Sequence, residues 1–381
     1  MKVFRFSGGR VAAASGVLDG AEIRVEQGRI ASIGPLSDAS GAVDLAGGWV
    51  LPGFIDTQVN GGGGVLFNDV PSVEGIAAIG AAHARFGTTG FLPTLISEDV
   101  DGIAAALDAT DAAIDAGVPG VLGVHIEGPV LNPARNGIHD ATKFRRLDRT
   151  LISLLTKHRS GRVLLTVAPE RVDLADIRTL AKAGVIVSAG HTEATFEQAE
   201  AAFDAGVSGV THLFNAMPPI YQRAPGIVGA TLDDPRPWSG LIVDRVHVAA
   251  PVLRMALKLR PFDKLMLVTD AMPSVGSNHK SFNLHGRKID VADGRCVYTD
   301  GTLAGSDLDM ATAVSNCVAD LGLTPDRVAL LASTNPAAFL GLSNERGALA
   351  PGLRADWVVL DAELRPVQTQ LAERAAELTT V

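Results

Sequence analysis

Short hydrophobic runs alternate with stretches of helical character through the middle of the chain. The runs are VLPGFIDTQ, GTTGFLPTL, GVLGVHIEG, RVLLTVAPE, GVIVSAGHT, GVTHLFNAM, GLIVDRVHV and KLMLVTDAM. Apolar runs of this length, bounded by turn residues, are typical of buried strands, and intervening stretches such as FEQAEAAFDAG carry apolar residues at helical spacing. Strand then helix, eight times over, predicts an α/β fold of the (β/α)8 TIM-like barrel type.

The two ends of the chain carry a different pattern. Residues 1–49 alternate short apolar runs with glycine turns, and residues 346–381 contain a matching piece, GALAPGLRADWVVLD. We therefore expect a small β-sandwich domain built from both termini around a barrel at residues 50–345. FNLHGRKIDVADGRCVYTDG, after the last barrel strand, predicts an inserted hairpin, and the tail AELRPVQTQLAERAAELTTV predicts a helix.

Composition limits the partners. The chain has 381 residues, 47% of them hydrophobic, which suits one large core with an appendage. A net charge of -9 and no long basic run argue against a nucleic-acid partner. No segment predicts a signal peptide or a membrane span, so we expect a cytoplasmic protein with no membrane partner. The two cysteines, Cys296 and Cys317, lack ligand spacing and indicate a reducing compartment.

Polar or ionisable residues stand where the predicted barrel strands end. In chain order they are Gln58, Thr94, Glu127, Glu170, His191, His212, His247 and Asp270. The carboxyl ends of barrel strands meet on one face of the fold, and barrels of this type form their active sites there. These side chains therefore define one candidate site.

Three of these residues form a candidate metal site. Glu127, His191 and His212 supply one carboxylate and two imidazoles from separate strands. Three such ligands with an open fourth position are the usual catalytic zinc arrangement, because the open position binds a water that loses a proton near neutral pH. Either histidine alone could be a hydrogen-bonded loop residue, but the three together favour a metal. Zn²⁺ suits these ligands, as do Fe²⁺, Co²⁺ and Mn²⁺.

Asp270, in VTDAM, has two interpretations. It is either a general base and acid that exchanges protons with the attacking water and the leaving group, or the N-cap of a following helix. Because Met272 and Pro273 follow at once, a loop and the catalytic role are favoured. His139 lies in the loop NPARNGIHD, where it could close over a ligand or be an exposed histidine without a function.

A second group suggests an anion site. Asn215 and Ala216 follow His212 directly, and backbone N–H groups in such a turn can bind an anion. Arg223 adds a charge of phosphate-compatible geometry, although a solvated loop arginine is the common alternative. His247 closes its run and should face the same pocket.

The stretch GFIDTQVNGGGG lacks the His-x-His pair that often stands near the start of a hydrolase barrel. Gln58 and Asn60 occupy the two histidine positions. Neutral amides are poor ligands for a borderline cation but good partners for water. We therefore expect these amides to hold waters in place of a second metal, and one divalent ion per subunit.

Taken together, the motifs resemble a known family. LPGFIDTQVNGGGG, GVHIEGPVLNPARNGIHD, SAGHTEAT, VTHLFNAM, VTDAM, GTLAGSDL, TNPAAFLGL and GALAPGLRADWVVLD resemble N-acetylglucosamine-6-phosphate deacetylases of the amidohydrolase superfamily. The resemblance runs in family order from about residue 45 to about residue 361. It implies metal-dependent hydrolysis of the acetamide of N-acetylglucosamine 6-phosphate, giving glucosamine 6-phosphate and acetate.

The resemblance also implies roles for single residues. Glu127, His191 and His212 would be the metal ligands, Asp270 the acid and base, and His139 the group that polarises the amide carbonyl. The phosphorylated amino sugar would contact Gly128, Asn215, Ala216, His247 and Leu303. Arg223 would reach the active site of a neighbouring subunit, which implies a homodimer.

Two alternatives stay open. The substrate could be N-acetylgalactosamine 6-phosphate or another acetamido sugar, because a few loop residues decide the direction of one hydroxyl. A non-catalytic sugar-phosphate-binding barrel would explain the missing His-x-His pair, but it would not need Glu127, His191, His212 and Asp270 together.

Overall fold

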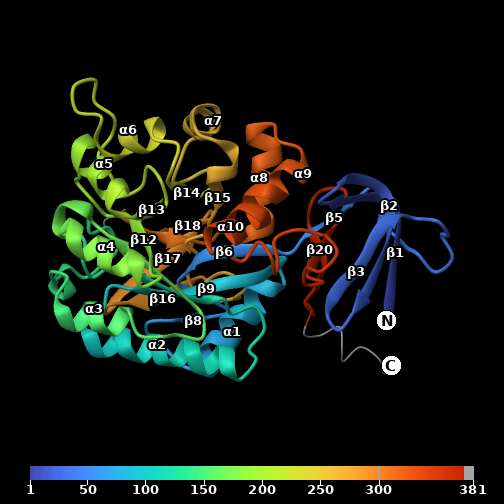
Figure 1. Ribbon diagram of the computed structural model, residues 1–381, viewed down its shortest axis with the longest axis horizontal. Helices are drawn as coiled ribbons and strands as arrows, with labels where there is room; N and C mark the ends of the chain where they lie inside the picture. Colours follow the sequence, from blue (N-terminus) through green and yellow to red (C-terminus); the bar gives the residue numbers. More distant parts are fainter. Residues whose placement is uncertain (299–300, 373–381) are drawn as a thin grey trace.

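Eight parallel strands form the barrel in a computed structural model that describes residues 1–298 and 301–372 (Figure 1). They hydrogen-bond in the order β15-β14-β13-β12-β11-β10-β9-β6. An isolated parallel bridge between Val59 and Ala271 links the first strand to the chain beyond the last. The predicted strands are confirmed as β6 (Phe54–Val59), β9 (Thr88–Ile96), β10 (Gly123–Glu127), β11 (Arg162–Val167), β12 (Ile186–Ala189), β13 (Val207–Val210), β14 (Trp238–Leu241) and β15 (Leu265–Leu267).

Helices surround the strands on the outside (Figure 1). Side-chain caps begin several of them: Ser72 accepts from the N–H of Gly75, and Thr195 forms a capping box with Gln198. The helices are α1 (Val73–Ala84), α2 (Val100–Asp115), α3 (Arg149–Leu155), α4 (Leu174–Lys182), α5 (Phe196–Ala205), α6 (Gly226–Asp233), α7 (Ala250–Leu259), α8 (Met310–Leu321), α9 (Pro325–Ala329) and α10 (Asn335–Phe339), with a π-helical turn at Leu330–Thr334.

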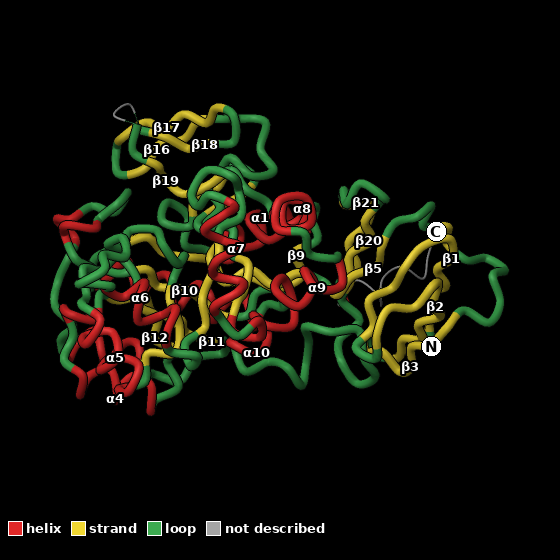
Figure 2. The backbone as a smooth tube through the Cα atoms, turned by 90° about the horizontal axis from the view of Figure 1, so that it is seen from above, coloured by secondary structure: helices red, strands yellow, loops and turns green. Residues whose placement is uncertain are grey.

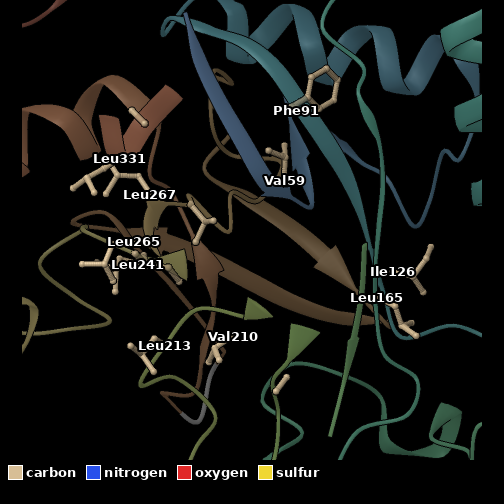
Figure 3. Packing of buried hydrophobic residues seen from close by; sticks show 14 of the residues in the cluster. Val59, Phe91, Ile126, Leu165, Val210, Leu213, Leu241, Leu265, Leu267 and Leu331 are labelled. Atoms are coloured by element: carbon tan, nitrogen blue, oxygen red, sulfur yellow. The ribbon is translucent and has the colours of Figure 1, made fainter. Parts of the chain in front are cut away.

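Alternate residues of each strand pack into different parts of the core. Ile126 and Leu165 belong to the large cluster between strands and helices, part of which Figure 3 shows. Their neighbour Leu164 joins a separate cluster with Met266 and Phe339. Because side chains alternate between the faces of a strand, this second cluster fills the inside of the barrel. The inward-facing position at the end of β10 is Glu127, so the alternation directs its carboxylate toward the barrel axis.

Both termini build one β domain beside the barrel (Figure 1). Its strands are ordered β21-β20-β5-β1-β2-β3, with β4 paired to β1. Trp357 is the centre of its core, with the ring of Phe4 at a centroid distance of 4.8 Å. The strands are β1 (Lys2–Ala13), β2 (Gly16–Glu26), β3 (Arg29–Pro35), β4 (Val43–Asp44), β5 (Trp49–Pro52), β20 (Trp357–Leu360) and β21 (Pro366–Gln370). The exact domain boundaries given above stay predictions.

The predicted helix at the C-terminal tail is wrong for the part that the structure describes. Residues 366–370 form β21, which pairs antiparallel with β20. The free edge of β20 offers hydrogen bonds to any extended segment beside it, and this pairing outweighs the weak helical preference of the local sequence. The rest of the tail, residues 373–381, lies outside the described residues.

The inserted segment is larger than the predicted hairpin. It forms a four-stranded antiparallel sheet of β16 (Ser281–Leu284), β17 (Arg287–Ala292), β18 (Arg295–Val297) and β19 (Leu303–Ser306). Figure 2 shows this sheet apart from the terminal β domain, above the barrel. Cys296 and Cys317 are both buried and unpaired. None of the described helices is long and apolar enough to cross a membrane.

Candidate active site

A cavity of about 370 Å³ opens at the carboxyl ends of the barrel strands. Nine of the predicted site residues line it: Glu127, His139, His191, His212, Asn215, Ala216, His247, Asp270 and Leu303. The expected convergence of separate strand ends on one site is therefore present in the structure. Residues of the inserted sheet, including Leu303 and Gly305, form part of the wall.

Three ligand atoms meet within this cavity. Nε2 of His212 lies 3.1 Å from Oε1 of Glu127, Nε2 of His191 lies 3.3 Å from the same oxygen, and the two nitrogens lie 3.0 Å apart. Ligand atoms about 2.0 Å from a tetrahedral zinc ion are roughly 3.3 Å from one another. The carboxylate and the two imidazoles therefore have the spacing and the chemistry to hold one divalent ion.

A second triad competes with this assignment. Ligand atoms of Glu127, His139 and His191 also lie within 4.8 Å of one another. The hydrogen bonds of His139 decide between the two sets. The backbone N–H of Ser97 donates to Nδ1 of His139 at 3.2 Å. Because a backbone N–H can only donate, Nδ1 carries the lone pair and Nε2 carries the proton in the neutral ring.

This tautomer makes His139 a hydrogen-bond donor toward the cavity, and it favours His212 over His139 as the third metal ligand. Burial holds its pKa well below the usual value, so the ring is neutral. His191 is held in the opposite way. Its Nδ1 lies 2.8 Å from the carbonyl oxygen of Arg135, to which it donates, leaving the lone pair on Nε2. Such outer partners fix the tautomer of metal-ligating histidines.

Asp270 lies beside the proposed ligands. The amide of Asn60 donates to its Oδ1 at 2.7 Å, and the amide of Gln58 lies 3.2 Å from the same oxygen and 3.0 Å from Oε1 of Glu127. Burial, assisted by the nearby charge of Glu127, raises the pKa of Asp270 to about 6. A carboxyl with this pKa can both take up and release a proton near neutral pH. The role of Gln58 and Asn60 in holding waters stays a prediction.

The backbone at this face is unusual. His191, His212 and Asp270 have φ values of 49°, 31° and 54°, in the left-handed region that non-glycine residues rarely adopt. Such conformations persist where the surrounding structure enforces them, and they concentrate at functional sites. Asp270 begins no helix, so the alternative of an N-cap does not apply.

Other predicted residues have more varied positions. His247 lines the cavity, with Nδ1 2.6 Å from Oδ2 of Asp244. Gly128 does not line the cavity, and an added Cβ there would come within 2.2 Å of Oγ of Ser97. Arg223 is exposed on the loop after Ala216 and does not line the cavity of its own chain.

Two strand-end residues support the site without facing it. Thr94 accepts from the N–H of Val59 inside the barrel at 2.9 Å. Glu170 stands on a 3-10 turn, Pro169–Arg171, and its carboxylate binds the side chains of Asn132 and Thr192.

Ser97 and Arg135 are among the residues of this face that were not predicted from the sequence. Ser97 stands directly after β9, so its position at a strand end was the available signal. Arg135 gave no such signal, since it lies in a loop.

A parallel barrel whose strand ends present one carboxylate, two imidazoles and a protonatable aspartate has the architecture of a metal-dependent hydrolase. Comparison with protein-family models agrees with this class. The model described as the amidohydrolase family matches residues 49–380. The chain therefore belongs to the amidohydrolase family, and it is an enzyme of the hydrolase class.

Within this family, the chain is similar to deacetylases of amino-sugar phosphates. It is 40% identical to the N-acetylgalactosamine-6-phosphate deacetylase of Shewanella sp. (strain ANA-3), over 86% of this chain and 83% of that protein. The N-acetylglucosamine-6-phosphate deacetylase of Pasteurella multocida has a TM-score of 0.93 and 32% identity, covering 97% of this chain and 98% of that one. The Mycobacterium smegmatis deacetylase, solved in complex with N-acetyl-D-glucosamine-6-phosphate, has a TM-score of 0.88 and 33% identity, with 97% of each chain covered.

Proposed function

We propose that this enzyme removes the acetyl group of N-acetylglucosamine 6-phosphate, yielding glucosamine 6-phosphate and acetate. The observation that carries the proposal is the meeting of Glu127 Oε1, His191 Nε2 and His212 Nε2 within 3.0 to 3.3 Å, beside Asp270. The similarity to deacetylases of phosphorylated amino sugars supports the substrate class.

Glu127, His191 and His212 would hold one divalent ion, for which Zn²⁺ is the first choice because of the mixed nitrogen and oxygen ligands. When bound, this ion supplies Lewis-acid activation of water and of the amide carbonyl. The remaining steps belong to the protein. Asp270 takes a proton from the attacking water and later transfers it to the departing nitrogen, which leaves as the free amine.

His139 stabilises the charge that develops on the carbonyl oxygen. Its Nε2–H points into the cavity because Ser97 occupies Nδ1, and the ring is buried, at 3% exposure. A fixed donor in a site that excludes water is most effective where negative charge develops during the reaction.

The phosphate of the substrate is proposed to lie at the turn after His212. Phe214 and Ala216 have φ values of 81° and 49°, and such alternating left-handed residues turn backbone N–H groups toward one point. Among the described residues, the N–H of Ala216 has no hydrogen-bond partner. His247 lines the same cavity.

We further propose a homodimer in which Arg223 reaches the phosphate in the neighbouring subunit. Arg223 is exposed on a loop that also exposes two large apolar side chains, Ile220 at 49% and Tyr221 at 58%. An exposed arginine beside apolar side chains is typical of protein interfaces. Sedimentation of the purified protein tests the homodimer, and a rise of KM for the phosphorylated sugar in R223M tests the contact with the phosphate.

N-acetylgalactosamine 6-phosphate is the second candidate substrate. The 40% identity to the Shewanella enzyme favours it specifically. Acetate release from the two phosphorylated sugars, each with and without a chelator, tests the function. We expect chelation to lower kcat at least about 100-fold and added Zn²⁺ to restore it. Activity unaffected by metal removal would contradict the metal-dependent mechanism, and absence of acetate release from both sugars would contradict the proposed function.

A further inference from the structure

Arg135 is the only lysine or arginine among the described residues that line the catalytic cavity. It ends a 3-10 turn, Pro133–Arg135, and its side chain is 30% exposed. The backbone carbonyl of this residue accepts from His191, but that contact does not involve the guanidinium. The contact with His191 therefore does not explain why a guanidinium lines the cavity at residue 135.

The guanidinium is paired at one edge only. Its Nε donates to Oε1 of Glu193, while the two Nη groups make no hydrogen bond to the described residues. Glu193 is itself 39% exposed at its side chain. The two Nη groups, which carry four of the five N–H donors of the guanidinium, are thus free in a residue that lines the cavity. A guanidinium in this state can receive a phosphate or carboxylate with its remaining donors.

The ion pair lies on the same side of the cavity as Ala216. The N–H of Thr192, next to Glu193 in the chain, donates to the carbonyl oxygen of Ala216 at 3.2 Å. Glu170 joins the two segments that carry the pair, since its Oε1 accepts from Asn132 and from the N–H of Glu193, each at 2.8 Å. Both backbones are therefore fixed, whereas the side chains of the pair stay accessible.

The charges around the cavity favour a cation near the phosphate of a bound substrate. Glu127 and Asp270 contribute carboxylates, and the imidazole of His247 is already paired with Asp244. A substrate that carries a phosphate dianion would meet these acidic groups. A metal ion at Glu127 would offset charge at the acetamide end, but the phosphate would lie at the other end of the substrate. Arg135 is the positively charged side chain of the same subunit that lines the cavity and can bind this phosphate.

We propose that Arg135 is a specificity-determining residue that binds the phosphate monoester of the substrate through its Nη groups, while Glu193 holds the guanidinium through Nε. This inference rests on the proposed function. It assigns preference for phosphorylated over unphosphorylated amino sugars partly to a residue of the same subunit as the metal ligands.

The test compares kcat/KM for N-acetylglucosamine 6-phosphate with kcat/KM for N-acetylglucosamine. In R135M, the ratio of the two values should fall on the order of 10- to 100-fold, mainly through KM, because a charge-assisted hydrogen bond to the phosphate is lost. R135K keeps the charge without the fork and should lose less of the ratio. The inhibition constant of inorganic phosphate should rise in R135M by a similar factor.

E193Q is the second variant, because glutamine removes the charge of Glu193 but keeps an oxygen that can accept from Nε and so leaves the guanidinium in place. The ratio should then stay within about threefold of the wild-type ratio. An equal loss of activity on both sugars in R135M would show that Arg135 acts only through its loop and His191, and would overturn the proposal. A wild-type enzyme inactive on both phosphorylated sugars would instead refute the proposed function.

Discussion

Buried polar side chains have different surroundings at the two ends of the barrel. At the amino ends of the strands, the amide of Asn335 donates to the carbonyl oxygens of Phe262 and Leu265 at 2.9 and 2.7 Å, and Ser333 donates to that of Pro52 at 3.1 Å. At the carboxyl ends, Glu127 and Asp270 share the donor Gln58 at 3.0 and 3.2 Å, which leaves two carboxylates close together.

Because of this difference, the amino ends of the strands contribute mainly to stability and the carboxyl ends mainly to function. The side chains of Asn335 and Ser333 at the amino ends make hydrogen bonds to the protein itself, so they stabilise the native state. Groups at the carboxyl ends combine burial, like charges and left-handed backbone, and such arrangements are typical of sites whose charges are completed by a ligand. Substitutions at the two ends should therefore affect different measurements.

The largest effect is expected for D270N. The asparagine side chain has nearly the same shape but cannot take a proton from water, so kcat should fall at least about 1,000-fold. The free energy of unfolding should stay equal or rise, because the substitution removes a buried like charge beside Glu127. Steady-state kinetics and chemical denaturation measure the two quantities, and metal content should be unchanged. Activity within tenfold of the wild type would refute the role of Asp270.

The converse result is expected for N335A at the other end. Loss of the amide leaves two buried carbonyl groups without their donor, which should lower the free energy of unfolding by about 2–3 kcal/mol. The value of kcat/KM should stay within about twofold, since Asn335 lies far from the cavity residues along the strands.

N344A is the control for that substitution, because Asn344 is an exposed asparagine a few residues after Asn335 in the chain. Its effect on unfolding should be below about 0.5 kcal/mol. A fall in the kcat/KM of N335A well beyond about twofold would contradict the separation of stability and function between the two ends of the barrel.

A smaller effect concerns the loop that carries the glycine run. His83 on α1 lies with Nε2 2.9 Å from the carbonyl oxygen of Gly61, and burial lowers its pKa to about 4. The unfolded chain, with a histidine pKa of about 6.5, binds more protons between these values. This contribution to stability is thus complete above about pH 6.5 and is lost as the pH falls toward 4.

Unfolding of the wild type and of H83Q at pH 7.5 and pH 5.0 isolates this contribution. Glutamine retains a donor for Gly61 but does not titrate. The wild type should lose on the order of 1–2 kcal/mol more than H83Q over this interval. Equal losses in both proteins would show that His83 does not titrate as its buried position requires.

The barrel and most of the site could be predicted from the sequence. The carboxyl ends of the strands in a parallel barrel meet on one face, whatever the path of the segments that connect the strands. Glu127, His191, His212 and Asp270 each stand at or just beyond such an end. The pattern fails where position depends on loops. Arg135 reaches the cavity through a turn, and Glu170 turns away from the cavity to bind Asn132 and Thr192.

Backbone contacts were also beyond the reach of sequence patterns. The N–H of Ser97 decides the tautomer of His139, and no residue type encodes a backbone donor. The C-terminal strand β21 was missed for a related reason, because it depends on the edge of β20 and not on its own residues. The sequence around His139 does not reveal the N–H of Ser97, and the sequence of β21 does not reveal the edge of β20.

The central claim is that Glu127, His191 and His212, and not His139, hold a single ion. A crystal structure of the metal-loaded protein with anomalous scattering tests it most directly. We expect one ion per subunit, bound by a carboxylate oxygen of Glu127 and by Nε2 of both His191 and His212, with Nε2 of His139 outside bonding distance. An ion bound by Nε2 of His139 in place of His212, or a second ion at Gln58 and Asn60, would contradict the account.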